Sequence, residues 1–262
     1  MKKHLSLTAL AILLTAVCMS FAMPQDNGGK GFSRKDLQGK WTIVKSKFPA
    51  PNADFDDWTG APTYLTFRKD GSFATSGIYG TCQGKFKLKD GQVTTKTDGK
   101  AALTFYIISM KDGVADVFCD ADDPFVDLYL RIAIVPETPQ QAREMLLCPW
   151  QHEYPSFEAD ESYIDFGKNG NIYFIAKIKE DPLEAGNYPD FAGRYVGFVE
   201  QAGYALSIDE DDCTHGYIYT PDGYECEISN LNAYSMEYCD RGRFYRHPQR
   251  IKYPVVPVRA YG

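Results

Sequence analysis

From Trp41 to Ile134 the chain consists of short segments in which apolar and polar residues alternate, with turn residues between them. A period of two residues predicts β-strands that bury one face. Asp-Gly pairs that begin at Asp70, Asp90 and Asp112 are typical of tight hairpins between antiparallel strands. We therefore expect eight antiparallel strands, over residues 41–48, 63–67, 72–76, 84–88, 92–96, 103–107, 114–119 and 126–132.

Eight successive antiparallel strands favour an up-and-down barrel, because closure removes the exposed edges of the sheet. An open sandwich of two sheets is the alternative. The inward side chains of the barrel either line a ligand cavity or fill the interior as a packed core, and the sequence leaves both open. These candidate ligand-binding residues are Leu65, Phe67, Phe73, Phe86, Leu88, Phe105 and Ile107.

The pattern changes after Ile134. Residues 138–147 are predicted to form a helix, with Thr138 as its N-cap, Pro139 at the first helical position and Gln141 completing a capping box. A shorter helical turn is expected from Ser33, just before the first strand. Beyond the helix, strand patterns return over residues 163–166, 194–200, 204–208, 216–220, 224–229 and 233–239.

The second half of the sequence repeats features of the first. A leucine precedes a tryptophan by four residues at Trp41 and again at Trp150. The strand and turn over residues 64–71 resemble those over residues 163–170. We therefore expect two tandem domains, 33–136 and 137–262, each an all-β antiparallel barrel preceded by a short helix, with the second copy divergent.

Residues 1–22 have the features of a signal peptide. Lys2 and Lys3 precede an apolar stretch that is too short to cross a bilayer, and small residues precede a cleavage site after Ala22. This predicts export to the periplasm or the extracellular space. Lipid attachment at Cys18 is the alternative, although the residues before Cys18 lack the usual leucine and the usual glycine or alanine. No later segment is long and apolar enough to be a transmembrane helix.

Six cysteines remain after this segment, and an even number in an exported protein predicts disulfides. Bonds within each half are the simplest arrangement. The first half would then contain a Cys82–Cys119 bond, and the second would contain two bonds among the other four. Those four are Cys148, Cys213, Cys226 and Cys239.

Charge and motif content narrow the possible functions. The formal net charge is −7, which argues against a nucleic-acid partner. No metal-ligand spacing joins His152, His215 and His247, and no nucleophile or phosphate-binding motif is present. Acidic clusters occur near residues 54–57, 120–123 and 209–212, but none matches a calcium-binding loop. We expect no catalytic residue, no metal and no cofactor.

The motif Gly39-Lys40-Trp41, the eight-strand pattern and the late Arg131 together resemble the lipocalin-like domain proteins of bacteria, a calycin-type β-barrel family. The hairpin Thr66–Gly71 fits the same family. The resemblance covers residues 33–134 and, more weakly, 138–250. It implies that Trp41 closes one end of the barrel with Arg131 packed over its ring, and it gives Trp150 the matching structural place.

The resemblance implies an exported, non-catalytic protein that holds a small apolar or amphipathic ligand inside a β-barrel. The alternative is a cell-surface or secreted module that binds a protein or a glycan through exposed tyrosines of the second half. These tyrosines are Tyr195, Tyr204, Tyr217, Tyr219, Tyr224, Tyr234 and Tyr238.

The domain boundary can be tested by limited proteolysis. If residues 23–136 and 137–262 are separate folding units, brief digestion yields at least one stable fragment that ends near residue 136. Mass spectrometry of the digest identifies its ends. Concerted loss of the whole chain, with no fragment accumulating, would contradict two independent domains.

Overall fold

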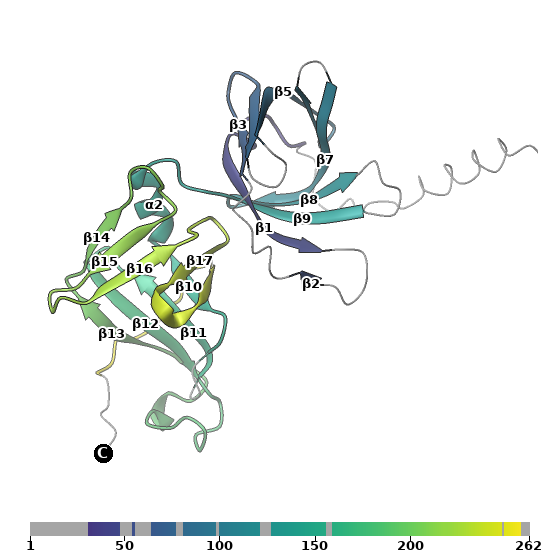
Figure 1. The fold of residues 1–262 in the computed structure, drawn as a ribbon. Coiled ribbons are helices and arrows are strands. Elements are labelled where there is room, and N and C mark those ends of the chain that lie inside the picture. Colours follow the sequence, from purple (N-terminus) through teal and green to yellow (C-terminus); the bar gives the residue numbers. More distant parts are fainter. Residues whose placement is uncertain are drawn as a thin grey trace, which may run out of the picture. The chain divides into compact units, whose positions relative to one another are not determined.

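The computed structural model describes residues 31–47, 54–55, 64–76, 81–97, 100–120, 127–155, 159–247 and 249–257. Strands dominate this part of the chain (Figure 1). The expected signal peptide over residues 1–22, including Cys18, lies outside the described residues. No helix in the described part is long and apolar enough to cross a membrane.

The first nine strands form one antiparallel sheet, ordered β2-β1-β3-β4-β5-β6-β7-β8-β9. β1 also pairs with β9, from Trp41 opposite Ile134 to Lys47 opposite Tyr129. This pairing closes β1 and β3–β9 into the eight-stranded barrel that the sequence predicts. The strands are β1 (Gly39–Lys47), β2 (Asp54–Phe55), β3 (Tyr64–Phe67), β4 (Ser72–Ser76), β5 (Cys82–Lys89), β6 (Gln92–Thr97), β7 (Lys100–Lys111), β8 (Val114–Asp120) and β9 (Asp127–Ile134).

One end of the barrel carries the predicted Asp-Gly turns. At this end the turns join β5 to β6 and β7 to β8, and both residues of each turn have positive φ angles. That conformation matches the twist of the paired strands, and asparagine, aspartate and glycine adopt it most readily. At the opposite end, residues 48–63 and 121–126 connect strands of the barrel. Short hairpins therefore define one end, which we call the hairpin end.

Residues before β1 cover the hairpin end. The Ser33 hydroxyl and backbone N–H both donate to the Asp36 carboxylate, at 2.7 and 2.8 Å. The Arg34 guanidinium lies 5.6 Å from the centre of the Phe86 ring. The prediction of a short helix before the first strand is wrong, because residues 34–37 form hydrogen-bonded turns instead. The backbone N–H groups of Asp36 and Gln38 each donate to the carbonyl oxygen three residues earlier.

Trp41 is fully buried inside the barrel, beside Leu65 in the register of β1 and β3. Its indole N–H donates to the Leu37 carbonyl oxygen over 2.9 Å. This bond explains the four-residue spacing between the leucine and the tryptophan. It satisfies the polar atom of a large side chain that would otherwise be buried without a partner.

Arg131 does not lie over Trp41, so this expectation from the resemblance is corrected. Trp41 is opposite Ile134, and strand alternation puts Arg131 on the other face of β9. There Arg131 Nε donates to Asp116 Oδ1 over 2.7 Å, and Nη2 donates to Oδ2 over 3.2 Å. Asp116 is its direct neighbour on β8. The two hydrogen bonds raise the pKa of Arg131.

The second half forms another nine-stranded antiparallel sheet, ordered β13-β12-β11-β10-β18-β17-β16-β15-β14. β13 and β14 are the two edge strands of this sheet, and they are not paired with each other within the described residues. The expected second closed barrel is therefore not confirmed. The strands are β10 (Pro149–His152), β11 (Ala159–Phe166), β12 (Asn171–Ile178), β13 (Tyr195–Ala202), β14 (Ala205–Ile208), β15 (Gly216–Tyr219), β16 (Glu225–Ser229), β17 (Ser235–Tyr238) and β18 (Arg243–Arg246).

The predicted helix is confirmed as α2 (Pro139–Leu146), between the two sheets in sequence. The Thr138 hydroxyl accepts a hydrogen bond from the backbone N–H of Gln141 over 3.2 Å. The Gln141 side chain in turn accepts from the Glu137 N–H over 2.7 Å. The other helical segments in the described part of the chain are the single 3₁₀ turns η1 (Pro189–Phe191) and η2 (Cys239–Arg241).

The repeated sequence features adopt the same local geometry. Trp150 is fully buried, and its indole N–H donates to the Leu146 carbonyl over 3.3 Å, as Trp41 does to Leu37. The turns that end β3 and β11 also share a pattern. In each, the first residue (Arg68 or Gly167) accepts a bond from a glycine and donates to the fifth residue.

The C-terminal segment covers part of the free edge of β13. Gly197 N–H donates to the Pro254 carbonyl, and the Val256 N–H donates to the Gly197 carbonyl, both over 2.9 Å. The Tyr253 ring occupies the space where a Cβ on residue 197 would stand. Glycine is therefore required here for the close approach. Within the described residues, the C-terminal segment makes no backbone pairing with β13 beyond Gly197.

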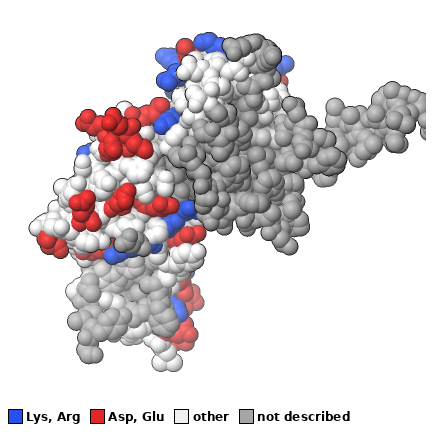
Figure 2. All heavy atoms as spheres, viewed as in Figure 1, with Lys and Arg blue, Asp and Glu red and all other residues white. Residues whose placement is uncertain are grey.

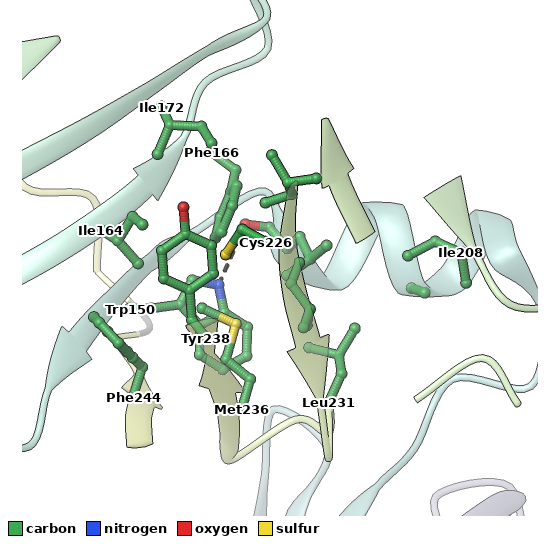
Figure 3. Packing of buried hydrophobic residues seen from close by; sticks show 14 of the residues in the cluster. Trp150, Ile164, Phe166, Ile172, Ile208, Cys226, Leu231, Met236, Tyr238 and Phe244 are labelled. Atoms are coloured by element: carbon green, nitrogen blue, oxygen red, sulfur yellow. Dashed lines mark hydrogen bonds between the residues drawn. The ribbon is translucent and has the colours of Figure 1, made fainter. Parts of the chain in front are cut away.

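Apolar side chains inside the second sheet form two clusters. The larger one surrounds Trp150 and includes the Phe166, Tyr238 and Phe244 rings (Figure 3). The smaller one contains Ala176, Ile178, Val196 and Phe198, among others. β11 and β12 each contribute residues to both clusters, so the boundary between the two clusters crosses these two strands.

The corrected position of Arg131 gives a mutational prediction. Trp41→Ala should lower the free energy of unfolding by about 3–5 kcal/mol, the usual cost of removing a large core aromatic. Arg131→Ala should cost about 0.2–1 kcal/mol, because its ion pair with Asp116 is about one-third exposed on each side. Urea denaturation of both variants and of the double variant measures these values.

The double-mutant cycles identify the contacts of Arg131. We expect Trp41→Ala and Arg131→Ala to be additive, since the two side chains lie on opposite faces of the barrel wall. Arg131→Ala and Asp116→Ala should be non-additive. The reverse pattern would restore Arg131 to the position over Trp41 that the resemblance implies.

Candidate functional site

The candidate ligand-binding residues of the first sheet all lie on the inward face, and the four phenylalanines among them pack around Phe67. The Phe67 ring is central: its centroid lies 5.0 Å from that of Phe86, 5.4 Å from Phe73 and 6.2 Å from Phe105. These four rings are at most 2% exposed. Leu65 and Ile107 are also buried, and Leu88 is half-buried. The structure therefore packs the four phenylalanines together near the hairpin end, with Leu65 and Ile107 buried on the same face.

The opposite end of the barrel interior has a more polar lining. Thr75 and Thr95 are buried, and Cys119 is 8% exposed. Thr75 Oγ1 lies 3.0 Å from Cys82 Sγ on the neighbouring strand. Burial raises the pKa of Cys119 to about 11, so this thiol stays protonated at neutral pH. A protonated, buried thiol is a poor nucleophile, which gives no support to covalent chemistry there.

The predicted Cys82–Cys119 disulfide is wrong. Both cysteines are free, because β5 and β8 are separated in the sheet by β6 and β7. In the second half, one of the two expected bonds is present, between Cys226 and Cys239. Cys148 and Cys213 are free, and burial raises the pKa of both.

A pocket of about 240 Å³ lies in the second half, which we call the Ser162 pocket. Ser162 and Ile164 come from β11, Phe174 from β12 and Phe244 from β18. Ile164 and Phe244 belong to the cluster around Trp150, whereas Phe174 packs against the smaller cluster. The pocket thus lies where the two apolar clusters meet. Its lining is completed by His152, Tyr154 and Arg241.

Ser162 is the distinctive residue of this pocket. It is 1% exposed, and its hydroxyl oxygen has no hydrogen-bond partner among the described residues. A buried hydroxyl without a partner costs about 1–3 kcal/mol. Most buried polar side chains are paired, so the few exceptions call for a specific explanation.

His152 and Arg241 form the polar side of the Ser162 pocket. His152 Nε2 lies 2.7 Å from the Arg241 carbonyl oxygen, which fixes the orientation of the ring. The centroid of the same ring is 4.6 Å from that of Phe244. The pocket therefore combines an apolar floor with a few polar groups of fixed position, the usual composition of a small-molecule site.

A second pocket, of about 340 Å³, contains Glu200, and we call it the Glu200 pocket. Glu200 and Gln201 line it from β13, and residues from β15 to η2 line it from the other side. The Cys226–Cys239 disulfide forms part of its wall. The remaining lining residues are Ile218, Thr220, Asp222, Tyr224, Tyr238 and Arg241.

Glu200 forms an ion pair through Oε1 with Arg241 Nη1. Its other oxygen, Oε2, is buried and has no hydrogen-bond partner within the part of the chain that the structure describes. The Glu200 side chain is only 14% exposed. Nearby, burial and then the charge of Glu200 raise the pKa of Tyr238, which remains a neutral phenol.

The acidic residues after β14 use their oxygens locally. Asp209 Oδ1 accepts from the Asp211 N–H over 2.8 Å, and Asp212 accepts from the Thr214 hydroxyl over 2.7 Å. Acidic side chains are prominent on the face drawn in Figure 2. Among the described residues, no group of three His, Cys, Asp or Glu is arranged to hold a metal ion.

Sequence reasoning missed both pockets. One signal was available for Ser162: it shares the inward face of β11 with Ile164 and Phe166, so a polar residue interrupts an apolar series. Glu200 and Arg241 gave no such signal, because 41 residues separate them in sequence and only the fold pairs them.

No protein-family model matches this chain, and a search of the curated proteins finds no significant match. The site must therefore be judged from its own geometry.

The cysteine assignment makes a prediction about stability. The Cys226–Cys239 bond joins residues 13 apart, and a loop of that size is worth about 3 kcal/mol by the chain-entropy estimate. The double variant Cys226→Ala/Cys239→Ala should lose about that much free energy of unfolding in urea. The double variant Cys82→Ala/Cys119→Ala removes no disulfide, so it should not lose free energy of unfolding through a missing crosslink. Peptide mapping of the wild-type protein should find both thiols unbonded. A Cys82–Cys119 linked peptide would contradict the assignment.

Proposed function

We propose that this protein is a non-catalytic binding protein that holds a small amphipathic molecule in the Ser162 pocket. The observation that carries the proposal is the buried Ser162 hydroxyl, which has no partner among the described residues and lies beside the apolar floor of the pocket. A ligand with an apolar body and one hydrogen-bonding group would cover Ile164 and Phe244 and would also satisfy Ser162.

The Ser162 hydroxyl has opposite effects on free energy in the empty protein and in the complex. Without a ligand, the Ser162 hydroxyl lowers stability, because burial has removed its water and supplied no substitute. With a ligand that bonds to it, the same hydroxyl contributes about 0.5–1.5 kcal/mol to binding. Ser162 thus lowers the stability of the empty protein and raises its affinity for a ligand, as expected of a residue that serves binding.

We also propose that the two halves are tandem copies of one lipocalin-like unit and that the protein is exported. The equivalent bonds of Trp41 and Trp150 to the leucine four residues earlier support a common origin of the halves. The Cys226–Cys239 disulfide is compatible with an oxidising compartment. In this proposal the first copy keeps a packed interior, and the second copy has opened into a binding site.

A second candidate function is recognition of a protein or glycan on the outer surface. It is favoured by Tyr217 and Tyr219, which are 39% and 42% exposed and have ring centroids 6.4 Å apart. Exposed tyrosines supply apolar area with a polar tip, which suits such surfaces. Loss of a glycan or protein partner in Tyr217→Ala/Tyr219→Ala, with small-molecule binding intact, would favour this candidate.

The Ser162 pocket can be tested with two probes of nearly equal shape. We expect p-cresol to bind about 3- to 10-fold more tightly than p-xylene, because only p-cresol can hydrogen-bond to Ser162. Ser162→Ala should remove this preference. The same variant should raise the free energy of unfolding of the empty protein, since it deletes an unsatisfied hydroxyl. NMR titration and urea denaturation measure the two effects.

Ser207→Ala is the matched control, because it makes the same change from serine to alanine at an exposed position of β14. It should leave the probe preference and the stability close to those of the wild type. If Ser162→Ala instead destabilises the empty protein, or if p-xylene and p-cresol bind the wild type equally, Ser162 is not the anchoring group and the proposal fails.

A further inference from the structure

The Glu200 pocket lies at the place where the second sheet fails to close. Glu200 and Gln201 belong to β13, whereas Thr220, Tyr224 and Cys226 lie on or next to β15 and β16. The C-terminal segment pairs with β13 at Gly197, several residues before Glu200. The end of β13 that carries Glu200 therefore faces a pocket rather than another strand.

The two oxygens of the Glu200 carboxylate have different surroundings. Oε1 accepts from Arg241, whereas Oε2 is buried with no partner among the described residues. An ionised carboxylate can only accept hydrogen bonds, so Oε2 requires a donor. Hydrogen bonds between a carboxylate and a cationic donor are roughly twice as strong as neutral ones. The free oxygen thus selects for a donor that carries positive charge.

The rest of the pocket agrees with a cationic ligand. Two of its three charged side chains are acidic, Glu200 and Asp222, and the third is Arg241, which Glu200 already neutralises. The Tyr224 and Tyr238 rings also line the space. Aromatic faces attract ammonium groups when these lie within about 6 Å. The unbalanced charge of the lining is therefore negative and is accompanied by aromatic rings.

We propose that the Glu200 pocket binds an organic ammonium ion, with the ammonium group donating to Glu200 Oε2 and the organic part against Tyr224 and Tyr238. This is a second site, separate from the Ser162 pocket, although Arg241 lines both. The Cys226–Cys239 disulfide holds the wall of the site in place, which reduces the ordering needed when a ligand binds.

Three probes of similar shape test the charge requirement by isothermal titration calorimetry: benzylamine, benzyl alcohol and benzoate. Benzylamine should bind at least 10-fold more tightly than benzyl alcohol, and raising the NaCl concentration should weaken it. Benzoate should bind most weakly. Equal binding of benzylamine and benzyl alcohol, tighter binding of benzoate, or no saturable binding of benzylamine would overturn the proposal.

Glu200→Gln keeps the size of the side chain and an acceptor for Arg241 but removes the charge, and it should weaken benzylamine binding at least 10-fold. Asp222→Asn provides a second variant at an exposed position, in case Glu200→Gln fails to fold, and should weaken binding by a smaller factor. Glu225→Gln is the matched control, since Glu225 is exposed on β16 outside the pocket. Equal losses in Glu200→Gln and Glu225→Gln would contradict a specific site.

Competition distinguishes this proposal from the proposed function. Saturating p-cresol should leave the benzylamine affinity of the wild-type protein unchanged, because the two probes occupy different pockets. If p-cresol does not bind at all, the proposed function fails, and the benzylamine result still decides the Glu200 pocket. Displacement of benzylamine by p-cresol would contradict a second site.

Discussion

The pairing of edge strands determines how the two halves of this protein differ. In the first sheet β1 pairs with β9, so β1 and β3–β9 form a closed ring in which each strand has a neighbour on both sides. In the second, β13 and β14 are not paired with each other within the described residues, and the C-terminal segment pairs with β13 only near Gly197. Unpaired backbone groups must be satisfied by something other than the sheet itself. The same opening gives Glu200 access to a pocket.

The interior of each half follows from this difference. In the closed barrel, the Phe67 ring and the three phenylalanine rings around it fill the hairpin end, and close packing leaves all four almost fully buried. In the second half, the apolar interior is split into two clusters with the Ser162 pocket at their junction. Two buried side-chain oxygens of the second half, Ser162 Oγ and Glu200 Oε2, have no hydrogen-bond partner among the described residues, and each one belongs to a residue that lines a pocket.

Local patterns predicted the strands of the first sheet and α2 well, because period-two alternation, Asp-Gly turns and the Thr138 cap act within a few residues. The sequence did not reveal β12. Its run of apolar residues is buried in both clusters, so it lacks clear alternation. Long-range contacts were predicted poorly: Arg131 turned toward Asp116, and Cys82 lies beside Thr75 rather than Cys119. Which strand faces are neighbours depends on the barrel register, which no short motif encodes.

We propose that ligand binding belongs to the interior of the second half and not to the packed barrel. Methyl NMR spectra with labelled isoleucine test this directly, since Ile164 lines the Ser162 pocket and Ile107 lies in the packed barrel core. On titration with p-cresol, we expect the Ile164 methyl resonance to shift and saturate while that of Ile107 stays in place. A saturable shift of Ile107 with Ile164 unchanged would contradict it.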